Sequence, residues 1–309
     1  MRGVNAIGKK LQFFGASRVG SGMFRAGAAG RALGSMTERP VDFLLECERW
    51  RNSSTRTSFD GYAHHRAQQM ALIAGWRGQR IAVLGAGNCN DLDLTRLAEA
   101  FREIHLFDID ARALAGAFER QSDRVQRACH LHERDLTGVA PLIEGWHRRP
   151  PQPLTAQIEG WSALARLVRE AGQFDAVLST CLLSQVAVNL RDFFGLTSTL
   201  NTALLAAITG HILLAKTLTK PGGRLLVTSD CITDQYPIHA EAAARGAIGA
   251  VLHLSQQGAA FPGTNPALIA DLLRDAQFAP PELKHAWVWD LNEQSYLVYA
   301  LETARHAND

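Results

Sequence analysis

The chain has 309 residues, of which 47% are hydrophobic and 20% are charged, as in an ordinary globular protein. No run of eighteen apolar residues occurs, and polar residues interrupt the most apolar stretch (residues 200–214), so we predict a buried helix there and no membrane span. The five cysteines are widely spaced and form no CxxC pair, which argues against a zinc site or a disulfide framework and favours a cytoplasmic protein.

Residues 1–37 carry six Lys or Arg and no Asp or Glu. Removing these six from the 32 basic residues leaves 26 against 30 acidic ones, so the rest of the chain is net negative. Because enzymes of nucleic acids usually carry their positive field on the folded body, this distribution disfavours DNA as a substrate. We interpret residues 1–37 as a flexible basic arm. It would be a transit peptide, an electrostatic tether, or the result of a translation start placed too far before Met36.

Residues 38–79 precede the predicted sheet, and we expect them to be largely helical and to form a cap or lid. Polar side chains are dense from Arg56 to Arg66. Within this stretch Tyr62 and His65 lie three positions apart and would share one helix face. The ordinary pKa of a histidine lies near neutrality, so His65 could serve as a general base. Both residues are therefore candidates for contact with a ligand, and a solvated amphipathic helix is the alternative interpretation.

From Arg80 onward, short apolar runs alternate with helical stretches, which is typical of βαβ units and a parallel sheet. The predicted strands are residues 81–84, 104–107, 129–133, 175–179 and 224–228. The predicted helices are residues 91–101, 111–120 and 161–171, with a further helix that ends near Lys220. Residues 147–153 are predicted to be a loop because of their proline content.

The end of the chain predicts a β-hairpin. Residues 285–290 and 295–301 are both rich in β-forming side chains, and only four residues separate them. Four residues are too few for a crossover connection, so the two strands must pair antiparallel. Residues 80–309 would form one ligand-binding domain, in which residues 139–170 and 231–264 are insertions and the second insertion could cover the site.

A ligand-binding site is predicted after the first strand, because open α/β sheets bind ligands at the carboxyl ends of their strands. Gly85-Ala86-Gly87 would allow a tight turn and a close approach to the ligand. Asn90 or Asp91 is expected to cap the following helix, whose positive end would face an anionic group. Asp108 ends the second strand and suits the two hydroxyls of an adenosine ribose, whereas Asp110 is expected to be a helix cap.

The glycine pattern discriminates between adenosine ligands. The dinucleotide fingerprint GxGxxG needs a glycine where this chain has Asn90. S-adenosylmethionine (SAM) carries a carboxylate and an amine in place of a pyrophosphate, and Asn88, Asn90 and Asp91 suit such a group. An NAD(P)-dependent enzyme is the less favoured alternative, against which the terminal hairpin also argues.

Five segments occur in a characteristic order: GAGNCNDLDL, LFDID, HERDL, FDAVLSTCLLSQV and LTKPGGRLLVTS. This series resembles the motifs of class I SAM-dependent methyltransferases. The resemblance implies an α/β, doubly wound and mostly parallel seven-stranded sheet closed by an antiparallel C-terminal hairpin, here with an N-terminal helical extension. Two positions depart from the usual pattern, since Val83 stands where many members have an acidic residue and Cys89 where many have a third glycine.

The resemblance also implies the roles of cofactor-binding residues. Gly85 and Gly87 would pass under the methionine part of SAM, and Asp108 would hold the ribose. Asp135 and the backbone of Leu136 would contact adenine, while Ser179 and Thr180 would lie near the sulfonium. The full predicted set is Gly85, Ala86, Gly87, Asn88, Asn90, Asp108, Ile109, Asp135, Leu136, Ser179 and Thr180.

No catalytic residue is identified, because methyl transfer from a sulfonium depends mainly on positioning and needs a base only for a protonated acceptor. Tyr62, His65 and His239 are weak candidates. His239 belongs to a polar group after the fifth strand, on the expected acceptor side, which also contains Asp230, Asp234 and Tyr236. No metal site is predicted.

Other reactive or aromatic side chains are expected to be structural. We interpret Cys181 and Cys231 as small buried residues, and Trp287 and Trp289, two apart on one strand, as core residues. The segment STCLLSQ lacks the Asn-Pro-Pro-aromatic signature of amino-group methylation on DNA bases. The predicted function is therefore methylation of a small molecule or a protein side chain. A SAM-fold regulatory protein without transferase activity is the alternative.

Overall fold

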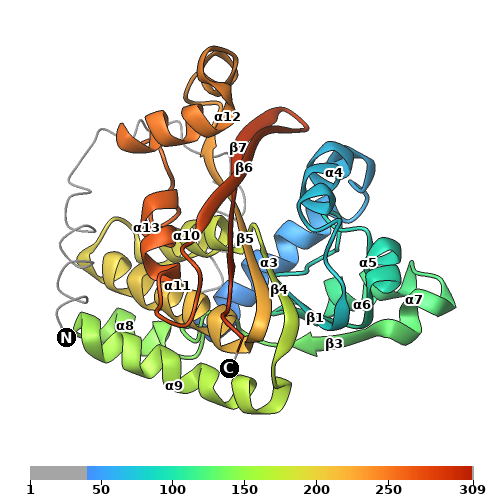
Figure 1. The fold of residues 1–309 in the computed structure, drawn as a ribbon. Coiled ribbons are helices and arrows are strands. Elements are labelled where there is room, and N and C mark those ends of the chain that lie inside the picture. The colour runs from blue at the N-terminus through green and yellow to red at the C-terminus, as the bar shows by residue number, and fades with distance from the viewer. Residues whose placement is uncertain (1–39, 308–309) are drawn as a thin grey trace.

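The computed structural model describes residues 40–307, so the predicted basic arm lies outside the described residues. Seven strands form one sheet in the order β3-β2-β1-β4-β5-β7-β6 (Figure 1). The strands are β1 (Gly78–Leu84), β2 (Phe101–Asp108), β3 (Cys129–Glu133), β4 (Phe174–Thr180), β5 (Thr219–Thr233), β6 (Glu282–Leu291) and β7 (Gln294–Ala304).

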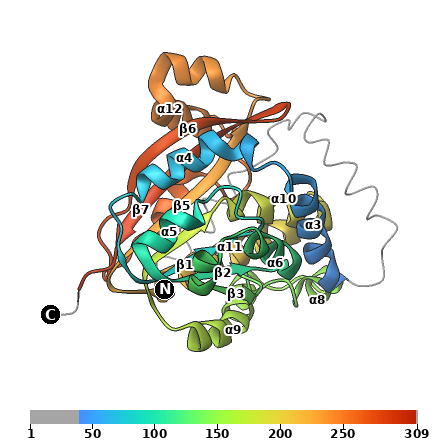
Figure 2. The same ribbon diagram turned by 90° about the vertical axis from the view of Figure 1, so that its right-hand side faces the viewer.

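The described helices cover both faces and the carboxyl edge of this sheet (Figures 1 and 2). They are α3 (Pro40–Thr55), the short 3₁₀ turn η2 (Asp60–Tyr62), α4 (Ala63–Leu72), α5 (Leu94–Ala100), α6 (Ala111–Glu119), α7 (Asp123–Ala128), α8 (Ile143–Arg148), α9 (Pro153–Ala171), α10 (Leu182–Phe194), α11 (Ser198–Leu218), α12 (Ile238–Gln256) and α13 (Pro266–Leu273).

The predicted fold class is confirmed. Strands β1 to β5 pair in parallel, and β7 pairs antiparallel with both β5 and β6. The register places Leu84 of β1 opposite both Phe107 and Ser179, so the carboxyl ends of β1, β2 and β4 meet at one edge. The winding reverses at β1, which is where open α/β sheets bind their ligands.

Two apolar layers enclose the sheet because its buried strands present apolar residues to both faces. On one face Leu84, Phe107 and Phe174 pack in a core cluster with residues of α8 to α13. On the other face Val83 and Leu106 pack with residues of α4 to α7 and with the β6–β7 hairpin. Trp287 and Trp289 are only 4% and 5% exposed in this second cluster, which confirms their predicted place in the core.

Two predicted helix boundaries are wrong for local reasons. The helix predicted over residues 91–101 is shorter and begins at Leu94, because the side chain of Asp93 caps it by accepting from Arg96 N. Neither Asn90 nor Asp91 is the cap. The helix predicted over residues 161–171 begins earlier, at Pro153, which occupies the favoured first turn, and α8 occupies part of the predicted 147–153 loop.

The apolar stretch near residue 200 belongs to α11. This helix is long and apolar enough to cross a membrane by composition alone, but 72% of its most apolar window is buried inside the protein. It packs against α9, α10 and α13 on one face of the sheet. It is therefore a core helix, as predicted for this stretch.

Residues 38–79 do contain helices, and these lie on two sides of the carboxyl edge. Helix α3 packs against α6, α8 and α10, whereas α4 packs against β6 (Figure 2). The segment 231–264 contains the end of β5 and helix α12, which stands beside β6 and β7 at the top of Figure 1. Its residues Asp234 and Phe261 reach the cavity described below.

Candidate functional site

Two cavities meet at Asp108, at the carboxyl edge of the sheet. The larger has a volume of about 850 Å³ and is lined by the loop after β1, the start of α10, the end of β5 and the β6–β7 hairpin. The smaller is lined by α3, α10 and the loops after β2 and β3. Asp108 lines both cavities, so it stands where an elongated ligand would pass from one to the other.

Backbone groups orient the carboxylate of Asp108. Its Oδ2 accepts a hydrogen bond from Gly87 N (2.8 Å), and its Oδ1 accepts from Asp110 N (2.9 Å). Burial, followed by the nearby negative charge of Glu48, raises the pKa of Asp108 to about 7. A carboxylate this costly to charge is stabilised when hydrogen-bond donors or a cation approach it.

The loop after β1 has a backbone that favours glycine at two positions. Gly85 and Gly87 have φ values of 82° and 46°, and a Cβ at Gly87 would lie 2.9 Å from Asn52 Oδ1. Cys89 also has a positive φ of 53°, at the position where many methyltransferases carry a third glycine. The loop therefore keeps the left-handed conformation there without the glycine.

The amide groups of Asn88 and Asn90 bind helix α3. Asn88 Nδ2 donates to the carbonyl of Asn52 (2.7 Å) and to Thr55 Oγ1 (3.2 Å), and Asn90 Nδ2 donates to the carbonyl of Thr55 (2.7 Å). Both residues line the larger cavity, and their Nδ2 groups are already bonded to α3. Asn90 Oδ1, in contrast, is buried without a hydrogen-bond partner, so it remains available to accept from the amine of an amino-acid group.

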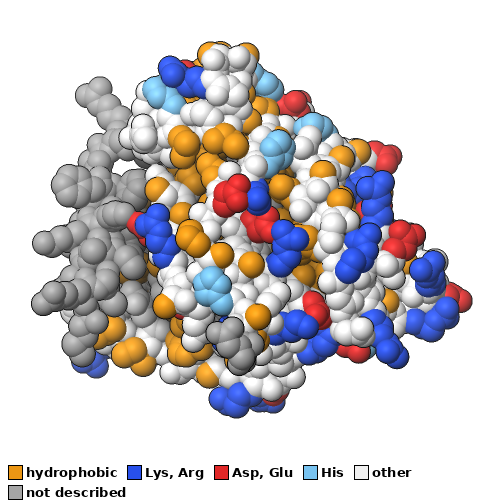
Figure 3. Space-filling model, in the orientation of Figure 1, with side chains coloured by type: hydrophobic (Ala, Val, Ile, Leu, Met, Phe, Trp, Pro, Cys, Tyr) orange, Lys and Arg blue, Asp and Glu red, His pale blue; other side chains and the backbone are white. Residues whose placement is uncertain are grey.

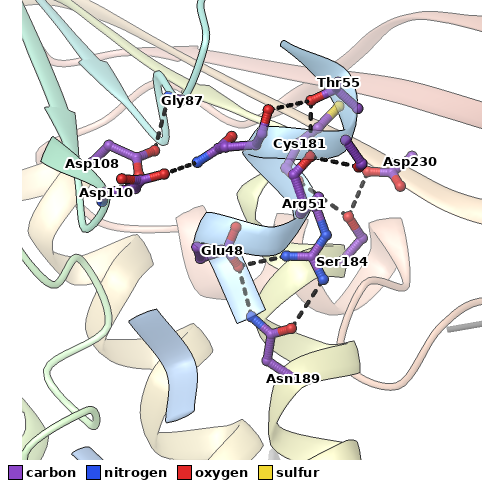
Figure 4. A network of polar contacts seen from close by, with 12 residues as sticks. Glu48, Arg51, Thr55, Gly87, Asp108, Asp110, Cys181, Ser184, Asn189 and Asp230 are labelled. Atoms are coloured by element: carbon purple, nitrogen blue, oxygen red, sulfur yellow. Dashed lines mark hydrogen bonds and ion pairs between the residues drawn. The ribbon is translucent and has the colours of Figure 1, made fainter. Parts of the chain in front are cut away.

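A closed polar network joins α3 to α10 (Figure 4). Arg51 donates to Glu48 Oε1 (2.7 Å) and to Asn189 Oδ1 (2.9 Å), and Asn189 Nδ2 donates back to Glu48 Oε1 (2.6 Å). On the same helix, Asn52 Nδ2 donates to Asp110 Oδ2 (3.0 Å). Asp110 also caps α6, as predicted, so this residue ties α3 to the end of β2.

The smaller cavity contains the two residues predicted to contact adenine, Asp135 and Leu136, together with Ile109 of the predicted cofactor-binding set. Ile109, Asp135 and Leu136 all line it, and Leu44 of α3 adds an apolar wall. The Asp135 carboxylate accepts from the backbone N of Thr137 (2.8 Å) and of Ala140 (3.0 Å), which folds the loop after β3. The geometry thus brings Ile109, Asp135 and Leu136 to the same side of Asp108.

Ser179 and Thr180 at the end of β4, both predicted to lie near the sulfonium, have different surroundings in the structure. Thr180 lines the larger cavity, and its hydroxyl donates to the carbonyl of Gly85 (3.2 Å). Ser179 is only 1% exposed, lines neither cavity and forms a 2.8 Å hydrogen bond with His211 Nε2. Successive residues of a strand face opposite sides of the sheet. The Ser179 side chain therefore points away from the cavity that Thr180 lines, and its predicted place near the sulfonium stays a prediction.

Of the three catalytic candidates, the structure brings Tyr62 and His65 to the larger cavity. His65 is fully buried rather than solvated, and its Nδ1 accepts from Trp287 Nε1 (3.2 Å). Burial lowers the pKa of His65 to about 3, which makes it a poor base at neutral pH. His239 lies outside the cavity, with an exposed ring 3.3 Å from Asp290.

The predicted acceptor-side group is only partly assembled. Asp230 and Asp234 line the larger cavity, whereas Tyr236 does not. Cys181 and Cys231 are buried, as predicted, and burial raises the pKa of both thiols well above the ordinary value. Cys181 Sγ lies 3.9 Å from His65 Nε2, but a thiol with a raised pKa is not an activated nucleophile.

Sequence reasoning missed the polar face of α3. Glu48 lines the smaller cavity and Arg51, Asn52 and Thr55 line the larger one, whereas the sequence-based prediction concerns the following segment, residues 56–66. Their spacing of three, four and seven positions is that of one helix face and is the signal that could have found them. Their partner Asn189, far along the chain, had no local signal.

One group of potential metal ligands lies at the opposite end of the strands. Among the described residues, Glu103, His105 and His130 bring ligand atoms within 4.8 Å of one another. The Arg80 guanidinium already lies there, with its Nε 3.2 Å from Glu103 Oε2 and its Nη2 3.4 Å from His105 Nε2. The carboxylate is thus already paired with a cation.

The strand order, with five parallel strands and an antiparallel terminal hairpin, is that of the Rossmann-like class I methyltransferase fold. No protein-family model matches the chain, and no curated protein matches its sequence.

Solved structures to which the chain is similar include methyltransferases. An O-methyltransferase family protein from Burkholderia thailandensis has 12% identity and a TM-score of 0.41 over 98% of this chain and 72% of that one. TrmN from Thermus thermophilus has 15% identity and a TM-score of 0.36 over 79% of this chain and 52% of that one. The YcgJ protein from Bacillus subtilis has 10% identity and a TM-score of 0.44 over 80% and 100%.

Proposed function

We propose that this protein is a SAM-dependent methyltransferase that binds its cofactor across Asp108. The observation that carries the proposal is the position of this carboxylate at the junction of two cavities, at the carboxyl ends of β1 and β2. The adenine would occupy the smaller cavity between Ile109 and Leu136, and the methionine part would lie along the Gly85–Gly87 loop. Asp108 would accept hydrogen bonds from both ribose hydroxyls.

The residues present fit such a cofactor. The smaller cavity offers an apolar slot for a flat ring, and the loop after β1 places two residues without a Cβ, Gly85 and Gly87, against the larger cavity. Bound SAM supplies a methyl group on a positively charged sulfur. The protein then has to hold the acceptor in line with that methyl and to exclude water.

Several described residues suit these tasks. The hydrogen bond from Thr180 to the Gly85 carbonyl connects the end of β4 to the loop after β1. It would hold the two sides of the methionine site together. Helix α3 closes the adenosine side through Asn52 and Thr55. The acceptor would enter the remaining part of the larger cavity, next to Asp230 and Tyr62.

Calorimetric titration with SAM tests the proposal. The wild-type protein should bind SAM, and Asp108→Ala should weaken binding by roughly 10- to 100-fold, because two charge-assisted hydrogen bonds are lost. Asp123→Asn, which neutralises an exposed carboxylate on α7, should leave the affinity unchanged. Absence of SAM binding at millimolar concentration would reject the proposed function.

A SAM-binding regulatory protein without transferase activity is the second candidate. Among the described residues that line the larger cavity, the histidine is His65, and its pKa of about 3 makes it a poor base. A cavity without a histidine of near-neutral pKa favours this second candidate. Incubation with SAM carrying a labelled methyl group and a small-molecule or protein fraction of cell extract distinguishes the two. Incorporation of label that Asp108→Ala abolishes would favour the enzyme.

We also propose a cytoplasmic location and an acceptor other than DNA. All five cysteines are free and buried, which suits a reducing compartment. On the face shown in Figure 3, Lys and Arg side chains alternate with Asp and Glu along the edge that carries α7 and β3. Such a mixed surface is unlike the continuous basic stripe by which proteins follow a phosphate backbone.

A further inference from the structure

The larger cavity extends beyond the cofactor loop to a region built by other elements. Its far wall is made by Asp230 and Asp234, at the end of β5 and just after it, and by Trp289 and Tyr296 on the terminal hairpin. Tyr62 of η2 completes this wall. These residues belong to other elements than the Gly85–Gly87 loop, although they line the same cavity.

The charges that line this cavity are mostly negative. Among the described lining residues five carry carboxylates and one, Arg51, carries a cation. Arg51 is already bonded to Glu48 and Asn189. Since His65 is neutral at pH 7, no further positive side chain of the described lining compensates Asp230 and Asp234.

Asp230 accepts its side-chain hydrogen bonds from neutral groups, although the nearby charge of Arg51 also favours its ionised form. Its Oδ1 accepts a 2.5 Å hydrogen bond from Ser184 Oγ, which fixes the carboxylate at the start of α10 (Figure 4). Removal from water raises the pKa of Asp230 to about 6. A carboxylate held in such surroundings is stabilised by a cation that enters the cavity.

Aromatic rings continue the wall beside these carboxylates. The ring of Trp289 lies 4.8 Å from that of Tyr62 and 5.4 Å from that of Tyr296, measured between centroids, and the ring of His65 stacks on it at 4.2 Å. The faces of such rings attract cations through their quadrupoles, and tryptophan does so most strongly. A carboxylate next to a set of aromatic rings is the usual recognition chemistry for ammonium groups.

We propose that the methyl acceptor carries a positively charged ammonium group, which binds between Asp230 and the aromatic wall of Tyr62, Trp289 and Tyr296. The inference rests on the proposed function, because only a methyltransferase has a methyl acceptor. The ammonium-binding site itself does not depend on that function. An anionic acceptor such as a phosphate would meet several carboxylates and a single guanidinium that is already paired.

The test uses choline and its neutral carbon analogue, in which carbon replaces the quaternary nitrogen. Both are titrated into full-length protein saturated with S-adenosylhomocysteine, and binding is followed by tryptophan fluorescence, since Trp50 and Trp289 line the cavity. Choline should bind at least tenfold more tightly than the analogue. Asp230→Asn should remove most of this difference and leave S-adenosylhomocysteine affinity within threefold.

Two further variants make the result decisive. Tyr296→Leu should weaken choline but not its analogue, and serves if Asp230→Asn fails to fold. Asp123→Asn, outside the cavity, should change neither ligand. Equal binding of the two ligands would overturn the proposal. So would choline binding that S-adenosylhomocysteine abolishes, because the site would then belong to the ammonium group of SAM itself.

The failure of the proposed function would look different. If S-adenosylhomocysteine did not bind, the same titration in cofactor-free protein would still show whether the cavity selects the cation over its neutral analogue. Selective binding there would support an ammonium site, and equal binding would reject it.

Discussion

Asp108 combines firm positioning with a high cost of ionisation. Two backbone N–H groups hold its oxygens, yet burial and the charge of Glu48 raise its pKa to about 7. Ribose hydroxyls would donate to the ionised form, so a bound cofactor should lower this pKa. Ligand binding and proton release are therefore coupled at this one residue.

This coupling predicts a pH dependence of SAM binding. Affinity should be complete above the pKa of about 7 and fall as Asp108 takes up a proton, becoming about tenfold weaker at pH ~6 than at pH ~8. Calorimetric titration at several pH values measures it. In Asp108→Ala, where binding is weaker, this dependence should largely disappear. An affinity of the wild type that does not vary over this range would show that the cofactor does not need the charged carboxylate.

For single residues, predictions from the sequence were correct where they depended only on the end of the adjacent strand. Asp108 and Asp110 have the positions predicted for a strand end and a helix cap. Sequence reasoning did not give the direction of the Ser179 side chain, which depends on the exact residue at which β4 leaves the sheet. It also failed for His65, because burial by Trp287 comes from a strand more than 200 positions away.

At the scale of elements, α3 is the part of the molecule that links the fold to the candidate site. It supplies residues to both cavities and is attached to the cofactor loop by Asn88 and Asn90. Its own stability depends on the ion pair between Glu48 and Arg51, whose side chains are 10% and 25% exposed.

Breaking this pair should therefore destabilise the protein. Arg51→Met leaves the Glu48 carboxylate unpaired near Asp108 and should lower the free energy of unfolding by about 2 kcal/mol, somewhat less than for a fully buried pair. Urea denaturation measures the change. Glu48→Gln in the same protein should recover part of the loss, because the isolated charge is then removed.

A matched control lies on the same helix. Arg49 pairs with Glu46 at the same spacing, but both side chains are about one-third exposed, at 30% and 34%. Arg49→Met should lower the free energy of unfolding by less than about 1 kcal/mol. An equal effect of the two arginine variants would contradict a special role of the network around Glu48.

At the scale of the whole molecule, the candidate site contains three buried carboxyl groups whose ionised forms are unfavourable. Asp91, Asp108 and Asp230 have pKa values raised to about 6, 7 and 6, in each case mainly by burial. A carboxyl whose pKa is higher in the folded than in the unfolded protein adds stability at low pH and loses it as the pH rises through the folded pKa.

In the cofactor-free protein these three groups should add about 1 kcal/mol of stability when the pH falls from ~8 to ~6.5. Buried His65 and His211, with pKa values of about 3 and 4, oppose this gain over the same range, because unfolded histidine already takes up protons near pH ~6.5. The contribution of Asp108 is therefore isolated by comparing the thermal unfolding of the wild type and Asp108→Ala across this range. The variant should lack about 0.8 kcal/mol of the carboxyl gain, and an identical pH dependence of the two proteins would contradict the prediction.

The sequence by itself determined the type of the sheet, with parallel strands closed by an antiparallel hairpin. The alternation of apolar runs and helices, and the short connection between the last two strands, which is Asn292 and Glu293 in the structure, leave few other arrangements because short connections force antiparallel pairing. Only the tertiary structure decided how the site is closed. The placement of α3, its contact with Asn189 and the joining of Asp230 to the hairpin aromatics are contacts between distant parts of the chain. Local periodicity contains no information about such pairings, because they depend on how complete elements pack.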